Sequence, residues 1–350
     1  SPDSEPFSLS WVCVTGFRIV LPRTELRNTI LDYYGTVEMN KSSRQRVAYF
    51  NGSIVPESQV LLPFRDRGFM YGDAVFDTAR TFGGRVFKLQ EHVDRLYRSL
   101  RYTQIDPGLS AGEMKTITEE VLEQNVSLLD EDEDYWVSQR VSRGLSSVDG
   151  EEPERSGSTV IVECTPLPLK ARARCFRDGI DVIVPAIRRV PQECFSPRVK
   201  SHNYLNLIMG DLAARAMNPD AWALLADTRG NLAEGYGCNF FTVYAGKLCT
   251  PKEQYVLAGM SRETVIVLAR ELGIPVLEKD LDLFDVSAAE EAFLSSTSIC
   301  ICGVRSVNGS QIGDGGVPGP VTKRLIEAYI RLVGYDFVAQ YLSHLNPAAA

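Results

Sequence analysis

Residues 196–206 read Ser-Pro-Arg-Val-Lys-Ser-His-Asn-Tyr-Leu-Asn, a pattern typical of a strand end that opens into a helix. Lys200 stands in the middle of this stretch. A lysine amine among apolar neighbours can lose its proton and form a Schiff base with an aldehyde cofactor. A lysine beside polar residues is otherwise usually a solvated surface side chain. The function of Lys200 therefore depends on what accompanies it in the chain.

A second stretch, residues 232–241, reads Leu-Ala-Glu-Gly-Tyr-Gly-Cys-Asn-Phe-Phe and places Glu234 at a glycine-rich turn before a short apolar strand. A carboxylate can keep a pyridinium nitrogen protonated, which turns the ring into an electron sink. A glutamate at a turn can also simply accept hydrogen bonds from backbone amides. Lys200 and Glu234 together favour the chemistry of pyridoxal 5'-phosphate (PLP).

A third block, residues 64–89, reads Phe-Arg-Asp-Arg-Gly-Phe-Met-Tyr-Gly-Asp-Ala-Val-Phe-Asp-Thr-Ala-Arg-Thr-Phe-Gly-Gly-Arg-Val-Phe-Lys-Leu, and Glu-His-Val-Asp-Arg-Leu follows at 91–96. With this block the chain resembles the fold-type IV PLP enzymes. That family contains branched-chain aminotransferases, D-amino acid aminotransferases, (R)-selective amine transaminases and aminodeoxychorismate lyases. The resemblance runs from about residue 46 to about residue 333.

The bulk properties limit the classes of partner. A chain of 350 residues is long enough for two domains, each with its own core. The formal net charge of -8 argues against a nucleic acid or an anionic membrane as partner, because binding to either needs a basic surface. No apolar run is long enough to cross a bilayer. We therefore expect small-molecule partners.

Cysteine and histidine usage makes a metal site improbable. The eight cysteines are scattered without zinc-site spacing, and histidine occurs only three times. The acidic opening Ser-Pro-Asp-Ser-Glu-Pro is the wrong start for a secretory signal, so we expect a cytoplasmic protein with reduced thiols and no metal. Apolar residues within 8–20 favour an arm that packs on a partner subunit over a flexible tail.

Local patterns predict a mixture of strands and helices. Alternation and turn signals predict strands at 46–55 (a hairpin around Asn51-Gly52), 73–82, 85–87, 135–143, 159–164, 181–184, 221–225, 239–243 and 291–294. Helical spacing predicts helices at 89–102, 110–125, 204–217, 262–272 and 321–332. Strands and helices do not alternate strictly, which disfavours a doubly wound Rossmann sheet and favours an α+β fold.

The resemblance implies a two-domain fold with the cofactor in the interdomain cleft. We predict an N-terminal extension (1–44), a small α/β domain (45–165), a proline-rich interdomain loop (166–177) and a large PLP-binding domain (178–340). Fixed backbone turns without periodicity make the third of these segments a plausible hinge.

The resemblance also assigns the cofactor site. Lys200 is implied as the Schiff-base lysine and general base, and Glu234 as the acid opposite the pyridine nitrogen. The remaining implied cofactor contacts are Tyr204 to the phenolic oxygen, Leu257 against the ring, and Arg95, Met260, Ser261 and Thr297 to the phosphate. Met260 and Ser261 offer backbone amides at a helix start, which is a natural anion site.

For the substrate, the resemblance implies contacts from Phe76, Arg80, Ser138, Arg140, Thr297 and Ser298. Arg80 is typical of branched-chain aminotransferases and of the lyases, and Arg140 stands where branched-chain enzymes recognise a carboxylate. Ser138 replaces the tyrosine expected beside it. Segment 143–147 is similar to D-amino acid and (R)-amine enzymes, and segment 317–322 is similar to (R)-amine transaminases. The chain therefore mixes the marks of several subfamilies.

The leading interpretation is a PLP-dependent aminotransferase. It would move an amino group between an amino acid (branched-chain-like) or a primary amine and a 2-oxo acid, with ping-pong kinetics. The family also implies a homodimer in which neighbouring loops close the substrate pocket. The alternatives are a D-amino acid or (R)-selective amine transaminase, and an aminodeoxychorismate lyase that ends in elimination. Retention of both Lys200 and Glu234 disfavours a relative that binds PLP without turnover.

Overall fold

The computed structural model describes residues 10–14, 17–21, 45–149, 151 and 157–345. Residues 1–45 and 46–350 form two separate compact units. In the first unit, β1 (Ser10–Val14) pairs with β2 (Phe17–Leu21) as an antiparallel hairpin. The rest of the predicted extension lies outside the described residues, so its assignment as an arm on a partner stays a prediction.

The second unit opens with an antiparallel sheet of six strands in the order β4-β3-β8-β7-β5-β6. Its strands are β3 (Val47–Phe50), β4 (Ser53–Pro56), β5 (Ala74–Phe82), β6 (Arg85–Val86), β7 (Tyr135–Ser142) and β8 (Thr159–Pro166). The predicted hairpin is confirmed, since Asn51 and Gly52 join β3 to β4 with φ of 50° and 104°. The short helix α2 (Arg67–Tyr71) precedes β5.

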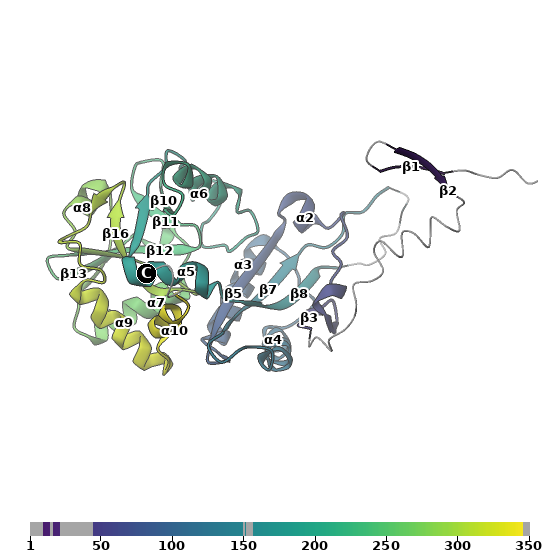
Figure 1. The fold of residues 1–350 in the computed structure, drawn as a ribbon, viewed down its shortest axis with the longest axis horizontal. Helices are drawn as coiled ribbons and strands as arrows, with labels where there is room; N and C mark the ends of the chain where they lie inside the picture. The colour runs from purple at the N-terminus through teal and green to yellow at the C-terminus, as the bar shows by residue number, and fades with distance from the viewer. Residues whose placement is uncertain (1–9, 15–16, 22–44, 150, 152–156, 346–350) are drawn as a thin grey trace, which may run out of the picture. The chain divides into compact units, whose positions relative to one another are not determined.

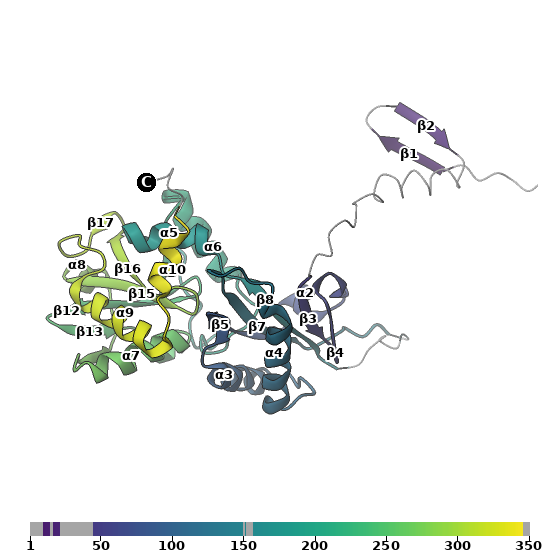
Figure 2. The ribbon, with the colours of Figure 1, turned by 60° about the horizontal axis from the view of Figure 1, so that its bottom comes forward.

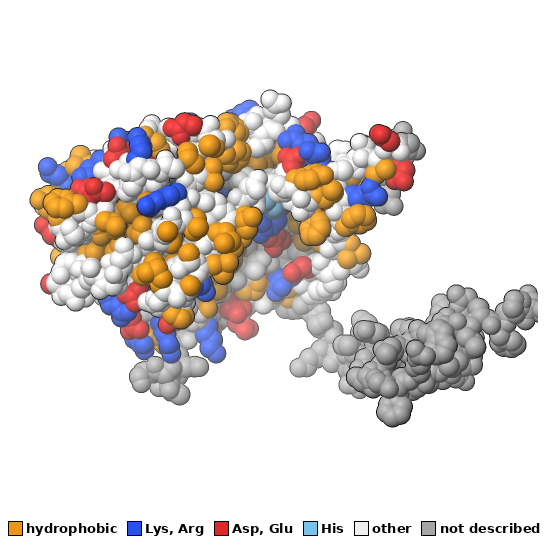
Figure 3. All heavy atoms as spheres, turned by 90° about the horizontal axis from the view of Figure 1, so that it is seen from above, with side chains coloured by type: hydrophobic (Ala, Val, Ile, Leu, Met, Phe, Trp, Pro, Cys, Tyr) orange, Lys and Arg blue, Asp and Glu red, His pale blue; other side chains and the backbone are white. Residues whose placement is uncertain are grey.

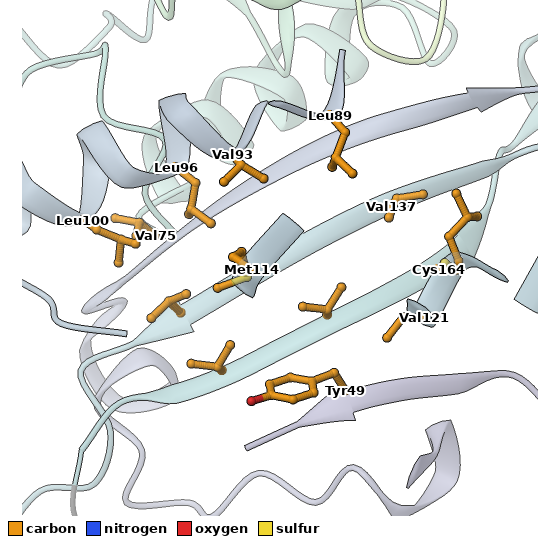
Figure 4. Close-up of a cluster of buried hydrophobic side chains, with 14 of the residues drawn as sticks. Tyr49, Val75, Leu89, Val93, Leu96, Leu100, Met114, Val121, Val137 and Cys164 are labelled. Atoms are coloured by element: carbon orange, nitrogen blue, oxygen red, sulfur yellow. The ribbon is translucent and has the colours of Figure 1, made fainter. Parts of the chain in front are cut away.

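Two amphipathic helices pack on this sheet (Figure 1), α3 (Leu89–Thr103) on β5 and α4 (Ala111–Val126) on β8. Ser110 caps α4 in a reciprocal capping box with Glu113. Figure 4 shows Val93 and Leu96 of α3 and Met114 of α4 pointing into one apolar cluster over the sheet. Burying each such side chain contributes about 1.5–3 kcal/mol, so this cluster holds the helices in place.

A nine-stranded mixed sheet forms the rest of the unit, with β11-β10-β9-β16-β15-β12-β13-β14 in line and β17 paired to β16. Its strands are β9 (Ile180–Ile183), β10 (Trp222–Ala226), β11 (Leu232–Gly235), β12 (Cys238–Tyr244), β13 (Lys247–Thr250), β14 (Val276–Glu278), β15 (Glu291–Ser296), β16 (Cys300–Val307) and β17 (Ser310–Gln311). Parallel pairs occur only at β9–β10, β9–β16 and β13–β14 among the described strands. A Rossmann sheet is excluded, and the α+β prediction is confirmed.

Six helices in the described ranges accompany this sheet (Figure 2). They are α5 (Leu169–Asp178), α6 (Leu205–Met217), α7 (Met260–Glu271), α8 (Leu283–Ser287), α9 (Pro320–Val333) and α10 (Phe337–Ser343). Helix α6 packs on β10, and α7 packs on α9. In the described ranges no helix combines the length and the apolar character that a bilayer crossing requires.

The segment predicted as an interdomain loop is in large part a helix. Helix α5 begins directly after Pro168, and its Phe176 ring stacks on Tyr341 of α10 at 4.3 Å between centroids. The prolines at 166 and 168 suggested a loop, but a proline just before the first helical residue is compatible with a helix. The further division of residues 46–350 into a small and a large domain stays a prediction.

Candidate active site

The backbone around Lys200 is fastened to the six-stranded sheet. The Lys200 carbonyl accepts a hydrogen bond from Phe76 N–H at 2.9 Å, and His202 N–H donates to the Ala74 carbonyl at 2.9 Å. The Lys200 N–H donates to Ser99 Oγ of α3 at 3.3 Å. The chain then enters α6, which packs on the other sheet. Lys200 is therefore held where the two sheets are linked.

Aromatic groups surround the Lys200 amine. Its Nζ lies 3.4 Å from the Tyr204 hydroxyl and 4.6 Å from the centroid of the Phe76 ring. The Tyr204 ring contacts Phe76 and Tyr236 at 5.5 and 5.6 Å between centroids. This environment combines apolar surface with one hydroxyl partner, as expected for a reactive amine.

A cavity of about 340 Å³ lies on one side of Lys200. It is lined by all the residues predicted to contact the cofactor: Arg95, Lys200, Tyr204, Glu234, Leu257, Met260, Ser261 and Thr297. We call it the cofactor cavity. Its volume falls in the range of small-molecule sites, which is about 300–1,000 Å³.

Glu234 is buried at the wall of the cofactor cavity with both carboxylate oxygens bonded. Arg189 Nε donates to Oε1 at 2.8 Å, and the Leu257 N–H donates to Oε2 at 2.9 Å. Arg189 also lines the cavity and was not foreseen from the sequence. The pairing fixes a carboxylate at the edge of the space that a ring would occupy.

Arg95 of α3 is held by a buried network. Its Nε and Nη2 donate to Asp77 at 2.7 and 2.8 Å, and its Nη1 donates to the Ala258 carbonyl at 2.7 Å. Burial alone would raise the pKa of Asp77, but Arg95 and His92 outweigh it and lower that pKa. A guanidinium carries five N–H donors, so Arg95 keeps donors for an anion.

The N-terminus of α7 supplies a second anion site. Gly259, its N-cap, provides no side-chain cap, and Met260 and Ser261 both line the cavity. A Cβ at position 259 would collide with the side chain of Asn239, which itself holds the Leu257 carbonyl at 3.0 Å. Unpaired amides and the helix dipole at such an end favour a negatively charged ligand.

Lys200 also lines a second cavity, of about 490 Å³. Among the predicted substrate contacts it is lined by Phe76, Ser138, Arg140, Thr297 and Ser298. We call it the substrate cavity; it shares Lys200, Tyr204 and Thr297 with the cofactor cavity. Figure 3 shows the molecule hollowed beside apolar side chains, with a histidine visible inside the hollow.

Arg140 lines the substrate cavity but already has a carboxylate partner. Its Nε and Nη2 lie 2.8 Å from Glu163 Oε1, and its guanidinium carbon lies 5.3 Å from the centre of the Phe76 ring. Ser138, which stands in place of an expected tyrosine, pairs with Thr78 through hydroxyls 2.9 Å apart. Both residues are in the cavity, and their roles there stay predictions.

His202 also lines the substrate cavity, and sequence reasoning gave it no role. Burial, followed by the nearby charge of Arg140, lowers the pKa of His202 to about 4. Its ring meets Phe76 edge to face at 5.1 Å between centroids. The imidazole is therefore neutral at physiological pH.

Arg80 does not line either cavity, contrary to its expected place beside the substrate. It is buried, and it donates to the Ser298 carbonyl at 2.7 Å and to Gln340 Oε1 at 3.0 Å. The bond to Ser298 fixes the turn after β15, and Arg80 makes it without lining either cavity. Gln340 belongs to α10, a helix that the sequence patterns did not predict.

Comparison with known proteins agrees with this geometry. The family model for amino-transferase class IV matches residues 74–307. A putative branched-chain-amino-acid aminotransferase of Methanocaldococcus jannaschii is 36% identical over 282 residues, covering 80% of this chain and 94% of the relative. The chain belongs to the class IV aminotransferase family.

Solved structures give the same answer. The branched-chain amino acid aminotransferase of Escherichia coli superposes with a TM-score of 0.74 at 28% identity, covering 83% of this chain and 95% of the other. The branched-chain amino acid aminotransferase of Thermobaculum terrenum, solved in its PLP form, gives 0.72 at 25% identity, covering 86% and 98%. The protein is therefore an aminotransferase enzyme with the fold-type IV architecture, and the resemblance noted from sequence is confirmed.

Proposed function

We propose that this aminotransferase uses PLP to move an amino group between a branched-chain-like amino acid and a 2-oxo acid. The observation that carries the proposal is that Lys200, Glu234 and the uncapped start of α7 line one cavity of about 340 Å³. The branched-chain aminotransferases among its relatives support the choice of substrate.

The residues present fit PLP. Arg95 and the first amides of α7 would hold its phosphate, and Glu234 would face its pyridine nitrogen. Ser295 lines the same cavity, and its Oγ is buried without a partner in the described part of the chain. When bound, PLP supplies an aldehyde that condenses with amines and a ring that withdraws electrons from the neighbouring Cα–H bond.

The chain's own residues supply positioning and proton transfer. Lys200 Nζ takes the Cα proton and returns it, and the Tyr204 hydroxyl at 3.4 Å orients that amine. Arg189 keeps Glu234 aimed at the cavity. Thr297 lines both cavities, so the turn after β15 can contact cofactor and substrate together.

The substrate cavity suits an amino acid with an apolar side chain. It is lined by aromatic rings, including Phe76, Trp136 and Tyr236, and by two arginines, Arg140 and Arg172. Rings provide apolar contact for an aliphatic group, and guanidinium groups provide hydrogen bonds to a carboxylate. A D-amino acid or (R)-amine transaminase and an aminodeoxychorismate lyase are the alternatives to be separated by experiment.

The test is a half-reaction screen on the PLP-loaded protein. L-leucine should change the cofactor absorbance and release 4-methyl-2-oxopentanoate, and 2-oxoglutarate should restore the spectrum. A response confined to D-amino acids or (R)-1-phenylethylamine would overturn the substrate choice. Formation of 4-aminobenzoate and pyruvate without an acceptor would identify the lyase, and an inert spectrum with every donor would identify a binding protein.

We further propose a homodimer. Large apolar side chains are exposed on the segment before β5, including Leu61, Phe64 and Phe69, and on α6, including Leu205 and Leu212. Exposed large apolar side chains on neighbouring positions of a segment are typical of an interface. Light scattering after size-exclusion chromatography should give twice the chain mass, whereas a fully active monomer would contradict the dimer.

We also propose a cytoplasmic location with reduced thiols. Seven cysteines of the described chain are free, which supports a reducing compartment. Cell fractionation followed by thiol labelling would test this, and recovery of disulfide-linked protein outside the cytoplasm would contradict it.

A further inference from the structure

The substrate cavity contains an arginine, Arg172, to which sequence reasoning gave no role. Arg172 of α5 lies between two tryptophan rings, with its guanidinium carbon 5.2 Å from the centre of Trp136 and 5.4 Å from that of Trp222. Trp136 belongs to β7 of the six-stranded sheet, and Trp222 belongs to β10 of the nine-stranded sheet. Arg172 Nη1 also donates to Ser298 Oγ. The guanidinium is therefore positioned from both sheets before any ligand arrives.

Arg172 forms no ion pair with the residues that the structure describes, although it also borders a neighbouring cavity lined by Asp178, Asp181, Asp211 and Asp220. No carboxylate of the described residues lies within ion-pair distance of it, whereas Arg140 in the same cavity is paired with Glu163 at 2.8 Å. Residues described as lining this cavity include no aspartate or glutamate. A partly enclosed cation without a carboxylate partner attracts an anion.

We infer that Arg172 is a substrate-binding residue that holds the carboxylate of the amino acid and of the 2-oxo acid. A guanidinium carries five N–H donors in a planar fork that matches a carboxylate, and Ser298 engages only one nitrogen of Arg172. The other arginines proposed for this task are committed elsewhere, Arg140 to Glu163 and Arg80 to a buried carbonyl and Gln340.

The inference rests on the proposed function, because the substrate cavity opens on Lys200. A purely structural role is the competing explanation, since Arg172 links α5 to both tryptophans and to the turn after β15. A structural role predicts that losing Arg172 weakens all ligands alike. A carboxylate-binding role predicts a loss confined to ligands that carry the negative charge.

The test uses two unreactive ligands of equal shape, 4-methylpentanoate and 4-methylpentanamide, titrated into the PLP-loaded protein by calorimetry. Arg172→Gln should weaken carboxylate binding about ten- to hundredfold, the effect of losing a charge-assisted hydrogen bond, and leave amide binding unchanged. Lys170→Gln is the matched control, because it removes one positive charge from an exposed position of the same helix. This control should bind both ligands as the wild type does.

Arg172→Lys provides a second test if the glutamine variant does not fold. It keeps a cation between the tryptophans but cannot donate two parallel hydrogen bonds, so carboxylate affinity should fall at least about threefold. Unchanged carboxylate affinity in a folded variant, or equal weakening of acid and amide, overturns the inference. A separate result would contradict the proposed function itself: wild-type protein that releases no 2-oxo acid from leucine.

Kinetics give a second readout. Relative to the wild type, Arg172→Gln should raise the KM for leucine far more than the KM for 1-phenylethylamine, which lacks a carboxylate. A parallel rise for both donors would assign Arg172 to packing and overturn its carboxylate role.

Discussion

The cofactor cavity and the substrate cavity meet at Lys200, but they balance their charges differently. On the cofactor side, Glu234 is paired with Arg189 and Arg95 is paired with Asp77. On the substrate side, Arg140 is paired with Glu163, whereas Arg172 faces the cavity without a carboxylate partner in the described chain. The cofactor side is thus fixed by protein partners, and the substrate side keeps one charge for its ligand.

This difference matches how long each of the two proposed ligands, cofactor and substrate, stays bound. A cofactor that stays through many turnovers benefits from groups whose geometry is locked by neighbours. A substrate that enters and leaves in each half-reaction must supply its own counter-charge. Mutations on the cofactor side should therefore affect stability and turnover, whereas mutations on the substrate side should mainly affect substrate affinity.

The largest effect should come from the residue common to both cavities. Under the proposed function, Lys200→Ala removes the amine that transfers the proton and should lower kcat for leucine about 10⁴-fold. Lys247→Ala, at an exposed position that begins β13, is the control and should retain wild-type turnover. Comparable activity in the two variants would separate Lys200 from catalysis.

A change on the cofactor side should affect both stability and turnover. Glu234→Gln leaves Arg189 without its carboxylate, so the free energy of unfolding should fall by about 3 kcal/mol. If Glu234 faces the cofactor ring as proposed, loss of its charge should also lower kcat about 10²-fold. Denaturant titration and steady-state kinetics measure the two effects.

The matched control is Glu291→Gln, which changes another buried carboxylate, one that accepts from the amides of Val321 and Thr322 and lines neither cavity. It should lose stability while keeping kcat near the wild-type value. If both variants lost turnover equally, Glu234 would have only a structural role.

The neutral histidine of the substrate side should make stability depend on pH. The pKa of His202 is lowered from 6.5 to about 4 by burial and by Arg140. Between these two pH values the imidazole is therefore protonated in the unfolded chain and neutral in the folded chain. The contribution of His202 to the free energy of unfolding is therefore fully present above about pH 6.5. It is lost as the pH falls toward 4, which lowers the free energy of unfolding by up to about 3 kcal/mol. Denaturation of His202→Gln across this range should show a shallower fall; an unchanged slope would contradict the buried neutral imidazole.

The smallest effect is expected at Arg140, because Glu163 already satisfies its charge. Arg140→Ala should raise the KM for carboxylated donors about three- to tenfold and the KM for simple amines less. This range corresponds to a partly exposed contact between Arg140 and the substrate carboxylate that contributes about 1 kcal/mol. The effect should be smaller than that of Arg172→Gln. Equal changes for acids and amines would remove Arg140 from carboxylate recognition.

The cofactor side could be predicted from sequence because its residues occur in local motifs. Lys200 precedes a helix, Glu234 stands at a glycine-rich turn, and Met260 begins α7, so each signal fits within a few residues. Arg189 was missed because its partner Glu234 lies 45 residues away and only the folded chain joins them. Pairing across such a distance leaves no local pattern.

The substrate side was less predictable because unpredicted elements build it. Arg172 lies on a helix that begins at a proline pair and was expected to be a loop. Arg80, which lines neither cavity, donates to Gln340 of α10, a helix of seven residues that is too short for a clear periodic signal. The central strand β16 was also missed, because its Gly303 and Arg305 interrupt the apolar run.

The most direct test of the account is borohydride reduction of the PLP-loaded protein, followed by proteolysis and mass spectrometry. We expect one reduced pyridoxyl group, covalently attached to the peptide that contains Lys200 and absent from Lys200→Ala. A pyridoxyl group on another lysine, or none at all in a protein that still transaminates leucine, would contradict it.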